Sequence, residues 1–515
     1  MKRLLCVFLC VVLTAGLLTG CDNGGDTSYV PTGAGLTWDE TDATGPHQSS
    51  QEEQVQELTL TCYPDRSLNP YLCTDFTNRA LFPLLYQSLF HVNREYQVEP
   101  VLCKSYRRSE DMKTYTFYLE NATFSDGSRL TAEDVAASLQ AAKESAIYGG
   151  RFFHILQIEP SADGGVTLQL NTAMENLPVL LDIPIVKKTE LEADQPVGTG
   201  PYSLETTFTG LRLRRKAYWW CSTADLVVTA PAITLVTAES PTQIRDEFEF
   251  SDLNLVCADP GSDRYVDYRC DFELWDCENG IYLYLGYNMD SDVFSDQEIR
   301  KAVTYAIDRD TIVAEHYRGF ARSASLPMSP LSPYYSQKLA ENYTYNSGKF
   351  TEAVSGLYQE EPVVLLVNSD DSLRLRVARD IQEMLESCGL EVKLEALKTS
   401  SYEYMLRTRQ FDLYLGQTKL SPNMDLSQFF SGSGALSYGG MADVTTYALA
   451  LEALANHGNY FTLHQKIMEE GLLCPILFRS YAVYATRGLL TDLTPARDNV
   501  FYYSLGKTME QAALN

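Results

Sequence analysis

The sequence predicts a mixed α/β (α+β) fold with more than one domain. Its 515 residues exceed the roughly 250–300 residues at which single hydrophobic cores stop growing. A hydrophobic content of 45% is enough to bury such cores. Strand-like and helix-like patterns alternate along the chain without an internal repeat. The net charge of −27 leaves no basic excess to neutralise phosphates, so nucleic acid is excluded as a partner.

The first 20 residues form a segment of their own. Lys2 and Arg3 precede an apolar run over residues 4–18, which is shorter than the about 20 residues needed to span a bilayer. We therefore expect a signal peptide over residues 1–20. Its end, Leu18-Thr19-Gly20-Cys21, resembles the lipobox of bacterial lipoproteins. This resemblance implies cleavage before Cys21 and a diacylglyceryl group on its sulfur; an ordinary secretory signal with a chance cysteine is the alternative.

Residues 22–56 differ sharply in composition from the rest of the chain. Gly, Ser, Thr, Asp, Glu and Gln dominate, and apolar periodicity is missing. Such a segment buries too little surface to offset its chain entropy. We expect residues 21–56 to be a flexible, lipid-anchored tether, with the lipid as the sole attachment to the membrane.

The body of the chain begins with a strand at residues 58–63 and continues with alternating elements. Thr131 is the expected N-cap of a helix, and Asp134 three residues later resembles the acidic partner of a capping box. Asp126-Gly127 before it predicts a turn. The remaining predicted strands are 115–119, 282–287, 363–367 and 392–397, and the predicted helices are 81–89, 131–145, 296–307 and 373–387.

The cysteines and histidines give no sign of a metal site. Of twelve cysteines, Cys6 and Cys10 leave with the signal peptide and Cys21 carries the lipid, so nine remain. An odd number cannot all pair, and no C-x-x-C motif occurs. We expect mostly buried free thiols, with one or two disulfides left open. Six histidines argue against a histidine-rich metal site, and we expect no metal and no cofactor.

Five motifs in one order across roughly residues 58–480 are typical of a single protein family. They are Tyr96–Pro100 with Thr114-Tyr115-Thr116-Phe117, the run F-S-D-G-S-R-L-T-A-E-D-V at 124–135, Gly198-Thr199-Gly200-Pro201-Tyr202, the stretch 212–219 ending in Tyr-Trp, and Asn288 with the run 294–309 ending in A-I-D-R. On these motifs the chain resembles the family 5 extracellular solute-binding proteins, the peptide-binding lipoproteins of ABC importers.

The resemblance implies a two-lobed, periplasmic-binding-protein-like fold of type II with an extra subdomain. Lobe I would comprise residues 57–80, 179–280 and 471–515, with a subdomain inserted at 81–178. Lobe II would comprise residues 281–470. Two crossing segments near Ile281 and Gly471 would act as a hinge that closes the lobes on a ligand.

The same resemblance implies a function. We expect a lipid-anchored extracellular substrate-binding subunit that captures an oligopeptide or related small solute and delivers it to an ABC permease and its ATPase subunits. It would act as a monomer on the outer face of the cytoplasmic membrane of a Gram-positive bacterium. A peptide-signal sensor of the same fold, not coupled to transport, is the alternative. An enzyme is not expected, because neither G-x-S-x-G nor H-E-x-x-H occurs.

The ligand-binding segment departs from the family pattern. In peptide-binding members, an Asp in a G-W-x-A-D-Y-x-x-P segment after an F-D-L strand holds the free amine of the peptide. Here Phe411-Asp412-Leu413 matches that strand, but alignment on Phe429-Phe430 places Pro422 at the amine-binding position. Asp425 follows three residues later. Either Asp425 binds the amine, or the ligand has no amine and Asp425 caps a short helix at 426–430.

Six residues are candidates for contact with the ligand. Tyrosine offers apolar area together with a hydroxyl group, Lys419 could pair with a ligand carboxylate, and Asp425 could pair with an amine. The candidate ligand-binding residues are Tyr63, Tyr202, Lys419, Asn423, Asp425 and Tyr438.

Overall fold

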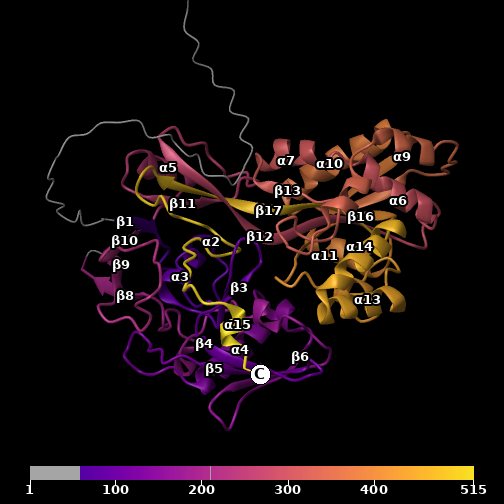
Figure 1. The fold of residues 1–515 in the computed structure, drawn as a ribbon. Coiled ribbons are helices and arrows are strands. Elements are labelled where there is room, and N and C mark those ends of the chain that lie inside the picture. The colour runs from indigo at the N-terminus through magenta and orange to yellow at the C-terminus, as the bar shows by residue number, and fades with distance from the viewer. Residues whose placement is uncertain (1–57, 209, 515) are drawn as a thin grey trace, which may run out of the picture. The chain divides into compact units, whose positions relative to one another are not determined.

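The computed structural model describes residues 58–208 and 210–514 (Figure 1). The predicted signal peptide, Cys21 and the predicted tether lie outside these residues, and those predictions stay predictions. In the described part of the chain, no helix is both long enough and apolar enough to cross a bilayer.

A four-stranded sheet carries the first strand of the body. Its strands are β1 (Leu58–Thr61), β10 (Ala232–Val236), β9 (Gly210–Arg215) and β8 (Tyr202–Thr207), in the order β1-β10-β9-β8. β1 runs parallel to β10, and the other pairs are antiparallel. Leu58, Leu60 and Ile233 are buried because alternate residues of these strands face the core.

A second four-stranded sheet lies in the segment that was predicted to be an inserted subdomain. It is antiparallel in the order β4-β5-β7-β6, with β4 (Cys103–Arg108), β5 (Thr114–Leu119), β6 (Ile155–Pro160) and β7 (Val166–Leu170). A hairpin of β2 (Phe90–Val92) and β3 (Val98–Pro100) precedes it. The predicted capping box at the start of α4 (Ala132–Glu144) is confirmed: Thr131 and Asp134 bond each other's backbone N–H groups.

The largest sheet has seven strands and runs through the middle of Figure 1. Two long antiparallel strands, β12 (Phe272–Tyr287) and β17 (Leu473–Thr486), form its centre. β11 (Leu255–Ala258) pairs with the far end of β17, while β13 (Ala321–Ser323) pairs nearer its start. β16 (Leu413–Lys419), β14 (Val363–Asn368) and β15 (Val392–Leu397) extend the sheet beyond β12.

The long strands are not regular throughout. The β12–β17 register shifts between Glu278 and Tyr282, and Gly280 there has φ +70°. Ile281 lies in this irregular stretch, and Gly471 lies just before β17. These are the two places predicted to cross between lobes; the lobe boundaries themselves remain a prediction.

Helices flank the sheets, most of them between residues 297 and 469. Arg300 and Arg309, both in the motif run 294–309, are buried and donate hydrogen bonds to the backbone carbonyls of Gly471 and Pro475, respectively. The α-helices not yet named are α2 (Phe76–Arg79), α3 (Phe82–Leu85), α5 (Pro241–Glu249), α6 (Gln297–Ala306), α7 (Arg309–Tyr317), α8 (Gln337–Ala340), α9 (Ser347–Ala353), α10 (Ser372–Ser387), α11 (Thr399–Arg407), α12 (Ser427–Phe430), α13 (Val444–Ala455), α14 (Tyr460–Glu469) and α15 (Met509–Ala512). The 3₁₀ helices are η1 (Gly149–Phe152), η2 (Leu177–Leu180), η3 (Lys188–Glu190), η4 (Glu341–Tyr343) and η5 (His457–Asn459).

One predicted helix and the cysteines differ from expectation. The helix expected over 81–89 is only the single turn α3, because Tyr86 takes an extended conformation and Gln87 bridges to Ile185. All nine cysteines of the described chain are free. The one or two disulfides that the sequence allowed are therefore not formed among them. Burial raises the pKa of the Cys62 thiol to about 12.

Candidate functional site

A cavity of about 480 Å³ lies between segments that are far apart in the sequence. One wall comes from the end of α2, the loop between α4 and η1, and a C-terminal loop. The other comes from the end of β16, the turn after it, α12 and the loop that follows. The lining residues are Thr74, Arg79, Ala146, Ile147, Tyr148, Gly150, Arg151, Thr418, Lys419, Leu420, Ser421, Asp425, Gln428, Ala435, Leu436 and Arg497.

A smaller cavity of about 70 Å³ shares part of this lining and adds acidic residues. Arg79, Tyr148, Arg151 and Arg497 line both cavities. The smaller cavity also reaches Asp182, Pro184, Asp498 and Asn499. Charged side chains from five separate segments therefore converge on one place.

Lys419 and Asp498 form an ion pair across the site. The Lys419 ammonium donates a hydrogen bond to the Asp498 carboxylate. Burial lowers the pKa of Lys419 to about 8, with Arg79 and Arg497 acting in the same direction. Burial opposes the ionisation of Asp498, but the charges of Lys419, Arg79 and Arg497 outweigh it and lower the pKa of that carboxyl group. The Lys419 side chain keeps 32% of its surface exposed, so a ligand can reach it.

Arg151 and Asp182 form the second ion pair. The Arg151 guanidinium bonds the Asp182 carboxylate and the carbonyl of Leu180, and it stacks over the Tyr148 ring with its carbon 5.2 Å from the centroid. Burial raises the pKa of Asp182 although Arg151 and Arg497 act against this. The pair is well buried, which fixes both side chains in place.

The two remaining cations, Arg79 and Arg497, have no acidic partner within ion-pair distance among the described residues. Arg497 is 4% exposed; one nitrogen donates to the carbonyl of Leu420, while Nε and Nη1 are buried without a partner in the described chain. The Nε of Arg79 is likewise buried without a partner among these residues. A buried donor with no acceptor costs free energy, so these nitrogens mark the part of the cavity that needs a ligand most.

Asp425 lines the cavity, but its carboxylate is already bonded. Oδ1 accepts a hydrogen bond of 2.7 Å from the Ser427 N–H at the start of α12, and Oδ2 lies 3.3 Å from Nε2 of His154. Burial disfavours the charged imidazole, but Asp425 outweighs it and raises the pKa of His154. The contact reaches the first residue of α12, but the N-cap of this helix is Leu426, which makes no side-chain cap bond, so Asp425 is not the N-cap that the alternative expected. The ion pair joins the turn before α12 to the chain just before β6.

The other predicted site residues lie away from this cavity. The Tyr202 side chain is fully buried, and its hydroxyl donates to the carbonyl of Ala230 at 2.8 Å, so it presents no surface to a ligand in this structure. Tyr63 stacks beneath the Arg66 guanidinium at 4.2 Å, and Tyr438 packs edge-on against Tyr414.

Asn423 stands in the same turn as Lys419 and Asp425 without lining the cavity. Its Oδ1 accepts a hydrogen bond of 2.7 Å from the Ser421 hydroxyl, and its backbone carbonyl accepts one of 2.5 Å from Tyr460. Of the six predicted residues, the structure thus brings Lys419 and Asp425 to the cavity. The sequence interpretation missed Arg79, Tyr148, Arg151, Arg497 and Asp498, which lie outside the family motifs; the Arg-Asp pair at 497–498 was the one local signal.

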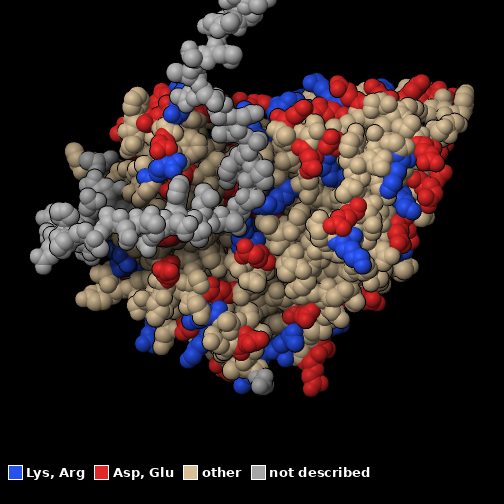
Figure 2. Space-filling view, turned by 45° about the horizontal axis from the view of Figure 1, so that its top comes forward, with Lys and Arg blue, Asp and Glu red and all other residues tan. Residues whose placement is uncertain are grey.

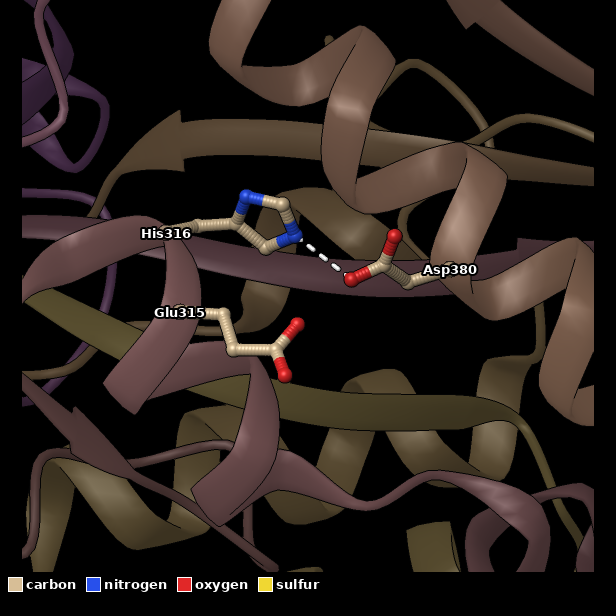
Figure 3. A group of neighbouring side chains, drawn as sticks. All are labelled: Glu315, His316 and Asp380. Carbon is tan, nitrogen blue, oxygen red and sulfur yellow. Dashed lines mark hydrogen bonds and ion pairs between the residues drawn. The ribbon is translucent and has the colours of Figure 1, made fainter.

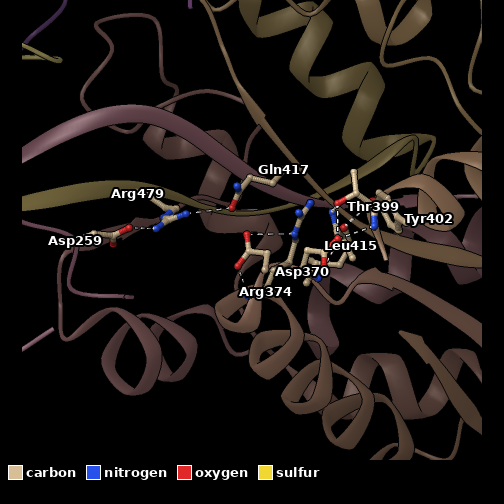
Figure 4. Close-up of polar contacts among 10 residues, drawn as sticks. Asp259, Asp370, Arg374, Thr399, Tyr402, Leu415, Gln417 and Arg479 are labelled. Atoms are coloured by element: carbon tan, nitrogen blue, oxygen red, sulfur yellow. Dashed lines mark hydrogen bonds and ion pairs between the residues drawn. The ribbon is translucent and has the colours of Figure 1, made fainter. Parts of the chain in front are cut away.

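A polar cluster beside the central sheet joins residues that precede and follow the long strands (Figure 4). Arg479 on β17 lies between Asp259 and Gln417, with nitrogen–oxygen distances of 2.7 and 3.3 Å. Asp259 follows β11, whereas Gln417 belongs to β16. Nearby, Tyr402 donates to the carbonyl of Leu415 at 3.1 Å. This cluster braces the sheet and does not line the cavity.

One group in the described chain has the composition of a metal site. The ligand atoms of Glu315, His316 and Asp380 lie within 4.8 Å of one another, and His316 Nε2 is 2.6 Å from the Asp380 carboxylate (Figure 3). Glu315 is exposed and the group sits on α7 and α10, away from the cavity. Two acids and a histidine on a surface form such ion pairs without a metal.

The surface and the cavity differ in charge. On the face drawn in Figure 2, acidic and basic side chains are interspersed among other residues, and acidic ones gather along the right-hand edge. The chain as a whole carries −27. The two adjoining cavities, by contrast, are lined by more cations than acids: Arg79, Arg151, Lys419 and Arg497 against Asp182, Asp425 and Asp498.

Known proteins resemble this chain over most of its length. The family model for bacterial extracellular solute-binding proteins, family 5 middle, matches residues 97–437. The oligopeptide-binding protein AppA of Bacillus subtilis is 22% identical over 381 residues, which cover 67% of this chain and 69% of AppA. The glutathione-binding protein GsiB of Escherichia coli is 25% identical over 358 residues, covering 64% and 67%.

A solved structure shows the same fold. The substrate-binding protein CtaP of Listeria monocytogenes superposes with a TM-score of 0.69 at 19% identity, covering 86% of this chain and 96% of CtaP. The predicted periplasmic-binding-protein fold is thereby confirmed. Because the family model matches residues 97–437, about two thirds of the chain, the chain belongs to the family 5 bacterial extracellular solute-binding proteins, which are substrate-binding components of ABC importers and not enzymes.

Proposed function

We propose that this protein captures an oligopeptide or related small solute in the cavity lined by Lys419, Asp425 and Arg497 and presents it to an ABC permease and its ATPase. The cavity carries the proposal: about 480 Å³ is the size of a small-molecule site, and its charged groups converge from distant segments. The lipid on Cys21, which lies outside the described residues, would keep the protein at the outer face of the membrane.

Closure of two lobes would enclose the solute. In the proposed division, Arg79, Arg151 and Arg497 belong to lobe I with its subdomain, and Lys419 and Asp425 belong to lobe II. A ligand that touches both walls stabilises the closed arrangement by its differential contacts, which is the requirement for ligand-driven closure. β12 and β17 would be the strands that flex.

The direct test begins with the protein's own ligand. The purified protein is denatured, the released small molecules are identified by mass spectrometry, and the compound found is titrated into refolded protein by calorimetry. Lys419→Ala should weaken binding about 10-fold or more, because a charged hydrogen bond is lost. Lys393→Ala is the matched control, since Lys393 is an exposed lysine on β15 far from the cavity lining. Equal affinity of all three proteins would refute this placement of the site.

Transport is tested separately in cells. Deletion of the protein should abolish uptake of the identified compound, and re-expression should restore it. Uptake that is unchanged by the deletion would favour the alternative of a signal sensor.

A further inference from the structure

The charge of the cavity points to the class of solute, and this step rests on the proposed function. We propose that the solute is a small anion carrying at least two carboxylates, and that its negative groups face Arg79 and Arg497. A zwitterionic peptide that depends on a free amine for its anchoring is the class that this cavity excludes.

The charged groups of the two adjoining cavities do not balance. Four cations line them, and the acids are Asp182, Asp425 and Asp498. Asp182 is paired with Arg151 and Asp498 with Lys419. The cations left over are Arg79 and Arg497, named above.

The third acid, Asp425, does not compensate for them. Its carboxylate is 9% exposed and is held by the Ser427 N–H and by His154. Both oxygens are engaged, so a ligand would have to displace Ser427 or His154 to bind Asp425. Asp425 therefore stabilises this wall of the cavity and leaves the excess positive charge in place.

One further acid that acts on Arg497, Glu278, makes its hydrogen bonds to other side chains. Glu278 accepts hydrogen bonds from Tyr96 and from the Ser329 hydroxyl, the latter at 2.7 Å. Burial raises the pKa of Glu278, although these bonds and Arg497 act against the rise. None of the described acids forms an ion pair with Arg497.

A guanidinium group without an ion-pair partner is what a carboxylate ligand would complete. Removing a charge from water without a partner costs several kcal/mol, and Arg497 has two buried nitrogens that lack an acceptor among the described residues. A carboxylate supplies both the charge and the acceptor oxygens, and arginine matches its planar geometry. Two arginines without an ion-pair partner among the described residues call for two such groups.

An amine, in contrast, would find every acid that lines the described cavities already engaged in an ion pair. The position to which the family resemblance assigns the peptide amine is Pro422 here, and each of the three lining acids already has a partner. Bringing an ammonium group into a cavity with excess positive charge adds repulsion. The solute therefore carries a net negative charge.

The experiment uses the purified full-length chain and probes of defined charge. Citrate and glutarate represent small polycarboxylates, and trialanine represents a zwitterionic peptide. We expect the acids to raise the thermal midpoint and to give a measurable calorimetric Kd, and trialanine to do neither. The compound released from the native protein should likewise be a net anion.

Arg79→Gln and Arg497→Gln should each weaken binding of the acid about 10- to 100-fold, because each removes a charged hydrogen bond. Arg66→Gln is the control, since Arg66 stacks on Tyr63 outside the cavity. If Arg497→Gln does not fold, Arg79→Gln still tests the inference. Arg79 is only partly buried, so we expect its replacement to leave the fold intact.

Two results would overturn the inference in different ways. A neutral peptide bound tightly, with an affinity that neither arginine variant alters, refutes the anionic class and leaves solute binding intact. A protein that releases no small molecule and binds neither acid nor peptide refutes the proposed function itself.

Discussion

The guanidinium group of Arg497 rests against Gly280, in the stretch where β12 and β17 lose their register. A Cβ atom on Gly280 would overlap all three terminal atoms of this guanidinium. Gly280 also has φ +70°, a conformation that other residues rarely adopt. The position of Arg497 in the cavity and the irregular stretch between β12 and β17 therefore both depend on Gly280.

Gly280→Ala should disturb both stability and binding. The left-handed conformation costs an alanine about 1–2 kcal/mol, and the overlap displaces Arg497 from the cavity, so solute affinity should fall as well. Denaturant unfolding and calorimetry measure the two effects. Gly356→Ala is the control, because Gly356 has φ +80° but open space around it; it should lose stability and keep its affinity. A Gly280→Ala protein with normal affinity would show that Arg497 does not need this contact.

Binding of an anionic solute should weaken as the pH rises from about 7 to about 9. Burial lowers the pKa of Lys419 to about 8, so its ammonium loses its proton across this interval. The unfolded chain keeps that proton to about pH 10.4, and the group's contribution to folding stability therefore rises with pH while the affinity falls. Calorimetry at several pH values checks this. In Lys419→Arg the charge persists, and a pH dependence that survives there would assign it to another group.

The Asp425–His154 pair should stabilise the fold in a pH-dependent way. The interaction with Asp425 outweighs the effect of burial and raises the pKa of His154. The stabilisation is therefore complete below the unfolded-state pKa of about 6.5 and is lost as the pH rises through the pKa of His154 in the folded protein. Asp425→Asn should cost about 1.5–3 kcal/mol near pH 5.5 and less near pH 8. Urea titrations at both pH values measure this. An equal loss at the two pH values would mean that His154 is not charged in the pair.

Membrane attachment should depend on Cys21. If this residue carries a diacylglyceryl group, two acyl chains hold the wild type firmly. Cys21→Ser should then appear in the medium or as an uncleaved precursor, measured by fractionation after a salt and carbonate wash. Retention of the mature serine variant in the washed membrane fraction would contradict the lipobox prediction.

Local sequence patterns predicted individual elements well. β15 occupies residues 392–397 as expected, and α4 begins at the Thr131 cap. In both cases the sequence signal is short-range. For β15 it is the alternation of side chains along the strand, and for α4 it is the reciprocal capping pair at the helix start. The helix expected over 81–89 stopped at Leu85 because the pairing of Gln87 with Ile185 overrides local preference.

The candidate site was only partly predictable. Lys419 and Asp425 could be found because they follow a strand that the family motif locates. Arg79, Arg151 and Arg497 come from three distant segments, and nothing within each segment indicates that they meet. Tyr202 was predicted to contact the ligand because it lies in a family motif. Its buried hydroxyl instead donates a hydrogen bond to the backbone carbonyl of Ala230.

The contrast between an acidic exterior and a cationic cavity has a kinetic consequence. A molecule with a formal charge of −27 repels an approaching anion at distances beyond the cavity mouth, while the arginines attract it once inside. Salt screens the long-range repulsion more than the short, enclosed contacts, since the Debye length is about 10 Å at 0.1 M. Raising the ionic strength should therefore increase both the association rate constant and the dissociation rate constant. The equilibrium constant is their ratio, so it would change less than either rate.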